Sequence, residues 1–118
     1  MPARGMAIGL WGVAAATLTG HGERIVTCLG KLTHEQIWAR GGEHENAVGN
    51  LVLHLCGNLR QYTRHAILGE ADVRVRDDEF NATSGAELAE RLRAVVADAA
   101  AIIRGVSEER LAEKTVVQ

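Results

Sequence analysis

The residues best suited to chemistry lie on one stretch, residues 45–65, where amides and imidazoles recur at helical spacing. At about 100° per residue, one narrow arc of a helix would collect the uncharged polar side chains Asn50, His54, Asn58, Gln61 and His65. An apolar arc adjoins this stripe, and Arg60 and Arg64 fall on the opposite, solvated side. The pattern predicts that the helix lines a metal or substrate site, or contributes to a buried hydrogen-bond network.

His54 is the candidate metal ligand, because a neutral imidazole coordinates zinc well. In that case Asn50, Asn58 and Gln61 would orient its ring and fix its tautomer. The alternative is an interior histidine held by Asn50 or Asn58, with the amides satisfying helix ends and each other. His65 lies three helical turns from His54, about 16 Å at 1.5 Å per residue, too far to share one ion. A catalytic zinc needs three protein ligands and a water, so His54 alone makes an incomplete site.

Two other groups of residues are weaker candidates. Cys28 and Cys56 are expected in the core, and neither has a nearby base or helix N-terminus that would activate a thiolate. The charged segment around Arg74 and Arg76 predicts a salt-bridged, solvated loop. Its alternative role is an anion or substrate clamp, since paired arginines suit carboxylates and phosphates.

The elements that must position these side chains are three helices, and no strand is expected. Apolar spacing predicts helices over about 7–29, broken near residues 20–22, over about 46–68 with Asn46 as N-cap, and over about 84–105. Thr33 and Gln36 have capping-box spacing for a single turn, and residues 70–82 are expected to form a loop. Gly69 and Gly105 are expected to end the second and third long helices.

The composition excludes several classes of protein. A length of 118 residues predicts one domain spanning 1–118. A net charge of −2 and an aromatic content of 3% argue against nucleic acid or an anionic membrane as partner. Two distant cysteines without a CxxC motif favour a reducing, cytoplasmic location. Residues 4–16 mimic a short secretory signal, but glycines interrupt an apolar run that is too short to span a bilayer.

The stretch LTHEQIWARGGEHENAVGNLVLHLCGNLRQ, followed by DVRVRDDEF, resembles the DinB/YfiT-like superfamily, most closely its DUF1572 subgroup. The likeness covers about residues 20–118, whereas residues 1–19 are atypical. It implies an all-α, up-down DinB-like bundle. It also implies a divalent metal, zinc or nickel, bound by one histidine of the second helix and an HxxxH pair of the fourth. His54 matches the first of these ligands. The chain ends where the fourth helix should begin, so we expect three main helices and an incomplete metal site.

Two functions follow from this resemblance. The first is a metal-dependent activity of the family type, a thiol transferase or hydrolase, acting on a small molecule that the sequence does not name. The second is a catalytically inactive, oligomeric helical module. A missing helix would leave apolar faces open, and such patches usually mark interfaces. We therefore expect a homodimer or higher assembly, with the segment Met6–Leu18 as the candidate to fill the fourth position.

Overall fold

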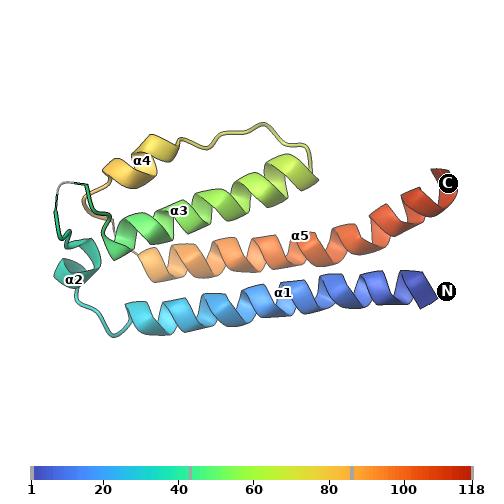
Figure 1. Ribbon diagram of the computed structural model, residues 1–118, viewed down its shortest axis with the longest axis horizontal. Helices are drawn as coiled ribbons and strands as arrows, with labels where there is room; N and C mark the ends of the chain where they lie inside the picture. Colours follow the sequence, from blue (N-terminus) through green and yellow to red (C-terminus); the bar gives the residue numbers. More distant parts are fainter. Residues whose placement is uncertain (1, 43, 86, 118) are drawn as a thin grey trace.

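Three long helices lie side by side in the computed structural model, with α5 between α1 and α3 (Figure 1). The structure describes residues 2–42, 44–85 and 87–117, with side chains described within residues 12–105. The elements are α1 (Pro2–Leu29), α2 (His34–Trp38), α3 (Val48–Arg60), its π-helical continuation η1 (Gln61–Ile67), α4 (Arg76–Asn81) and α5 (Leu88–Val117). No strand occurs in the described ranges. The predicted all-α class is therefore confirmed.

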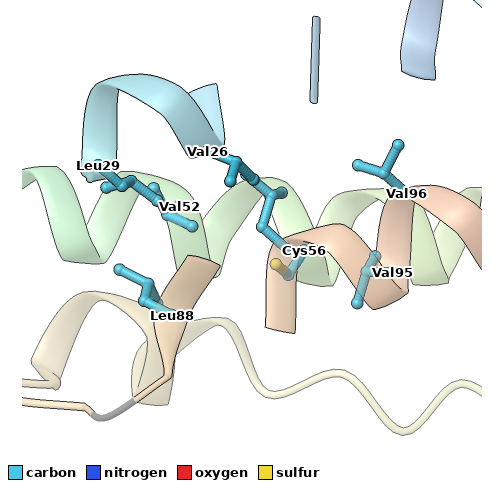
Figure 2. Packing of buried hydrophobic residues seen from close by; sticks show 8 residues of the cluster. Val26, Leu29, Val52, Cys56, Leu88, Val95 and Val96 are labelled. Atoms are coloured by element: carbon cyan, nitrogen blue, oxygen red, sulfur yellow. The ribbon is translucent and has the colours of Figure 1, made fainter. Parts of the chain in front are cut away.

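The core forms where α5 meets its two neighbours. Apolar residues on α5 recur at intervals of three to four, which places them on one side of that helix. The core cluster comprises Val26 and Leu29 of α1, Val52 and Cys56 of α3, and Leu88, Leu92, Val95 and Val96 of α5 (Figure 2). Leu92 is fully buried at its centre. Packing of these helices fixes α3, and α3 in turn carries the polar stripe.

Glycines inside the long helices do not interrupt them, contrary to two of our predictions. Helix α1 runs unbroken through residues 20–22. A Cβ on Gly22 would lie 2.9 Å from Cγ1 of Val96, so this glycine permits close packing of α1 on α5. Helix α5 continues through Gly105 to Val117. The residues after Gly105 are mostly good helix formers, which outweigh the roughly 1 kcal/mol that one glycine costs.

Other predicted boundaries also differ from the structure. The loop expected over residues 70–82 contains the short helix α4. Helix α5 begins at Leu88, later than the predicted start at Ser84, directly after Glu87 with its φ of 56°. The capping box of Thr33 and Gln36 is confirmed by reciprocal hydrogen bonds of 3.1 and 2.9 Å.

The two ends of the α3–η1 unit are defined differently from each other. Its N-cap is Ala47 rather than the predicted Asn46, and the Asn50 side chain accepts a hydrogen bond from the Ala47 amide. At the other end Gly69 adopts a φ of 75°, the left-handed conformation that ends many helices. This stop was predicted. The π-helical turn before it was not, and such turns occur frequently at functional sites.

The N-terminal segment does not form a separate helix. Residues 6–18 belong to α1, and α1 packs along α5, so the expectation that this segment fills a fourth position is wrong.

Cys28 is exposed rather than in the core, whereas Cys56 is buried as predicted. No helix among the described residues is both long and apolar enough to span a bilayer.

Candidate functional site

The segment that follows η1 turns back over α3 and ends in α4 (Figure 1). Asn50 binds the last part of this returning segment, at the C-terminal end of α4. The Asn50 Nδ2 donates to the carbonyls of Glu79 at 2.9 Å and Ala82 at 2.7 Å, while its Oδ1 accepts from the Ala47 amide at 3.0 Å. Asn50 is completely buried, so nearly all of its hydrogen-bonding capacity goes to fixing backbone. The Asn50 side chain therefore bonds to the backbone at the start of α3 and at the end of α4, and not to His54.

Arg74 holds the middle of the returning segment against α3. Its side chain is only 7% exposed and that of Glu79 only 12%. The Arg74 Nε and Nη2 donate to the two carboxylate oxygens of Glu79 at 3.1 and 3.0 Å, and Nη1 donates to Gln61 Oε1 at 2.9 Å. A bidentate pair of this geometry is among the stronger side-chain contacts. The predicted salt bridging of this segment is therefore present, but it is buried rather than solvated.

A glycine on α3 makes room for this ion pair. A Cβ built on Gly57 would collide with Glu79 Oε2 and lie 2.9 Å from Arg74 Nε. The guanidinium and carboxylate therefore approach the helix backbone where any other residue would push them out. This close approach places the Arg74–Glu79 ion pair beside the polar stripe, where Arg74 contacts His54 and Gln61.

The same arginine sets the tautomer of His54. Arg74 Nη2 lies 3.0 Å from His54 Nδ1. A guanidinium can only donate hydrogen bonds, so Nδ1 must be the accepting nitrogen and the proton of the neutral ring lies on Nε2. Glu79 Oε1 is farther from Nδ1, at 3.4 Å. Because the His54 side chain is 34% exposed, its remaining nitrogen can offer an N–H to a ligand.

His65 has the opposite arrangement. Its Nδ1 lies 2.8 Å from the Glu70 carbonyl oxygen, and a carbonyl can only accept. Nδ1 therefore carries the proton, and Nε2 of the neutral ring presents a lone pair. His54 and His65 are thus held as one donor and one acceptor by partners that the returning segment supplies.

Both rings line one open cleft of about 470 Å³. Its walls are formed by His54, Asn58, Gln61, Tyr62, His65, Ala66, Arg74 and Arg76. Four of the five members of the predicted polar stripe line this cleft, and only Asn50 does not. The prediction that the stripe lines a site agrees with this geometry. Sequence reasoning missed Glu79 and the inward position of Arg74. The sequence carries one signal for this ion pair, which is Gly57 in the run VGNLVLHLCGNLR, because it lies directly against Arg74 and Glu79.

Carboxylates around the cleft are engaged by other groups. Asp72 accepts from Gln61 Nε2 at 2.9 Å and from the Arg74 amide at 3.1 Å, and these bonds hold the pKa of Asp72 below its usual value. Arg64 donates to Asp98 at 2.6 and 2.9 Å and to Glu70 at 2.9 Å. Arg64 therefore ties η1 to α5, which differs from the solvated role predicted for it.

The metal-binding prediction has limited support from geometry. Among the described residues, no three His, Cys, Asp or Glu side chains lie close enough together to hold an ion. Burial raises the pKa of the Cys56 thiol, which agrees with the prediction that this cysteine is not a nucleophile. Within the described residues, His54 offers a hydrogen-bond donor, and ligation through Nε2 would require its proton to move.

Comparisons with protein families, with curated proteins and with solved structures yield no match for this chain.

Proposed function

We propose that the chain binds a carboxylic acid with a hydroxyl group at the far end of its carbon chain, in the cleft between His54 and His65. The observation that carries this proposal is the hydrogen bond from Arg74 to His54 Nδ1. It leaves Nε2–H as a donor, which suits a carboxylate oxygen. Nε2 of His65 then suits the proton of a hydroxyl at the other end of the ligand.

The charge of the cleft agrees with an acidic ligand. Glu79 neutralises Arg74, whereas Arg76 forms no ion pair with any described residue and packs near Phe80, 6.0 Å from the ring centroid. The cleft is therefore lined by one cation without a counter-ion and by no carboxylate. Tyr62 and Asn58 add further polar groups to its wall. Because the cleft is open, we expect modest affinity from hydrogen bonds and charge alone.

Nuclear magnetic resonance titration with 8-hydroxyoctanoate and octanoate tests the proposal. The hydroxy acid should bind more tightly than octanoate, because only its terminal hydroxyl can reach His65 while the carboxylate is bound at His54. His54→Ala should weaken both acids at least about tenfold, the effect of losing about 1.4 kcal/mol. His65→Ala should remove the preference for 8-hydroxyoctanoate. His21→Ala is the matched control, since His21 is an exposed histidine of α1. Equal binding by wild type and His54→Ala, or no binding of either acid, would contradict the proposal.

A metal-dependent activity of the DinB type, with zinc or nickel at His54, is the second candidate. It is favoured by the 3.4 Å distance from His54 Nδ1 to Glu79 Oε1. If the proton moved to Nδ1, Glu79 would accept it in a hydrogen bond and Nε2 would be free to ligate, an arrangement typical of metal-binding histidines. A bound metal would lower the pKa of a thiol or water, and further ligands would have to come from outside this cluster.

Metal analysis separates the two candidates. Near-stoichiometric zinc or nickel that is lost in His54→Ala but kept in His21→Ala would support the family-type enzyme. Carboxylate binding that is insensitive to chelators and to added zinc would support the first proposal. The oligomeric alternative predicts a homodimer, which sedimentation at micromolar concentration would detect.

A further inference from the structure

A second groove, of about 400 Å³, is formed where the returning segment and α4 face the start of α5. It shares no lining residue with the cleft at His54. Helix α4 packs on α3, and no comparable contact joins α4 to α5 within the described ranges. The space between α4 and α5 therefore stays open, and its volume lies within the roughly 300–1,000 Å³ of small-molecule sites.

Much of the lining of this groove is apolar. Leu53 of α3 is half-buried and Leu88 of α5 is buried, and both belong to the lining. Val73 and Val75 line the same groove although they are 77% and 56% exposed. The side chains on either side of Val73 are bonded to η1, and Val75 is the N-cap residue of α4. Both valines are therefore held in place by their neighbours and offer a preformed apolar surface.

Two charged side chains without partners also line the groove. Asp78 of α4 and Arg91 of α5 are exposed, and neither side chain forms a hydrogen bond or an ion pair with any described residue. Glu79 is the other carboxylate of the lining, but both of its oxygens accept from Arg74. The groove thus has one uncompensated negative charge on α4 and one uncompensated positive charge on α5, which do not pair with each other.

We propose that this groove binds a free apolar peptide of two or three residues, with its ammonium end at Asp78 and its carboxylate end at Arg91. A guanidinium suits a terminal carboxylate, because it can donate two parallel hydrogen bonds. Such a peptide carries opposite charges only at its two ends, about 3.3–3.6 Å apart for each residue of extended chain. Its apolar side chains then contact the valines and leucines of the lining.

Nuclear magnetic resonance titration of the full chain with leucyl-leucine and leucyl-alanyl-leucine tests the proposal. Because the groove is open, we expect millimolar affinity, with amide shift changes at Val73, Val75 and Leu88. Free leucine should bind more weakly than either peptide, since it has one apolar side chain only. Acetylating the ammonium end of the tighter peptide, or amidating its carboxylate end, should each weaken binding about threefold, as for loss of one exposed charge pair.

Two variants assign the two ends of the peptide. Asp78→Asn should bind the free and the acetylated peptide equally well, and Arg91→Gln should bind the acid and the amide equally well. In each case the variant removes the partner of the group that the modification removes. Asp77→Asn and Arg24→Gln are the matched controls, because both residues are exposed and lie outside the lining of the groove. Both controls should discriminate among the peptides as wild type does.

Three results would overturn the proposal. The first is the lack of any shift change up to about 20 mM peptide, roughly twenty times a millimolar dissociation constant. The second is a peptide blocked at both ends that binds as tightly as the free one. The third is loss of peptide binding in His54→Ala, which would place the peptide in the other cleft. Otherwise His54→Ala should bind the peptide as wild type does, so failure of acid binding at His54 does not imply failure here.

Discussion

Asn50 and His54 lie one helical turn apart on the same stripe of α3, yet their side chains differ in hydrogen bonding and in exposure to solvent. Asn50 has no exposed surface and is bonded on both sides of its amide to backbone groups. His54 is bonded at one ring nitrogen only, and a third of its side chain is exposed. The Asn50 site is therefore closed and structural, whereas the His54 ring keeps one nitrogen free to bond to a ligand.

The difference arises in the segment that returns over α3. Opposite Asn50 it supplies the carbonyls at the end of α4, which a buried amide can satisfy. Opposite His54 it supplies a side chain, Arg74, which binds one edge of the ring and leaves the other edge open. A polar residue on a helix therefore becomes structural or available according to what the opposing segment presents. Breaking the contacts at each site should produce effects of different size.

The largest effect is expected from Arg74→Ala. It leaves the Glu79 carboxylate nearly buried without its partner, and loss of one member of a buried ion pair typically costs 3–5 kcal/mol, so we expect a loss of about 3 kcal/mol. Chemical denaturation measures this change. The double variant Arg74→Ala/Glu79→Ala should recover part of it, since no charge is then stranded. A loss below about 1 kcal/mol in the single variant, as for a surface pair, would show that the pair is solvated.

A smaller loss, about 2 kcal/mol, is expected from Asn50→Ala. The Ala47 amide and the carbonyls at the end of α4 would lose their partner, and unsatisfied buried groups cost about 1–3 kcal/mol. Asn58→Ala is the matched control. Asn58 is half-buried and lines the cleft, and its side chain forms no hydrogen bond with any described residue. Its replacement should therefore stay within about 0.5 kcal/mol of wild type. Equal losses in the two variants would remove the distinction between a closed and an open site.

The smallest effect is expected at the Arg64–Asp98 contact, which is more than a third exposed on both sides. Hydrogen bonds from Arg64 hold the pKa of Asp98 below its usual value. A carboxyl whose pKa is lowered in the folded state stabilises the fold above its unfolded pKa, about 3.9, and loses this contribution as pH falls through the folded value. The stability difference between wild type and Asp98→Asn should therefore shrink on acidification from pH 6 to pH 3. A difference that is constant or grows over this range would argue against the contact.

Much of this organisation could be predicted from the helical pattern. The sequence predicted Cys56 in the core, and periodicity grouped His54, Asn58, Gln61 and His65 on one side, where they line one cleft. Helix periodicity is a local property, so it is readable without knowledge of distant residues. The stop at Gly69 was predictable for the same reason.

The unpredicted features depend on contacts between distant segments. Arg74 and Glu79 were assigned to a solvated loop, because nothing in their local sequence shows that Gly57 leaves room for them. Cys28 was placed in the core on apolar neighbours alone, although the helix turns it outward. The break expected in α1 and the end expected for α5 were also wrong, because a glycine within a helix is tolerated when packing or flanking residues favour the helix.

The most direct test of the account is the tautomer of the two histidines, read from the ¹⁵N chemical shifts of their ring nitrogens at a pH where both rings are neutral. The account predicts a protonated Nε2 on His54, set by Arg74, and a protonated Nδ1 on His65, set by the Glu70 carbonyl. A protonated Nδ1 on His54 would contradict it. In that case Glu79 would be the partner of the ring, and the metal-dependent function would become the better explanation of the cleft.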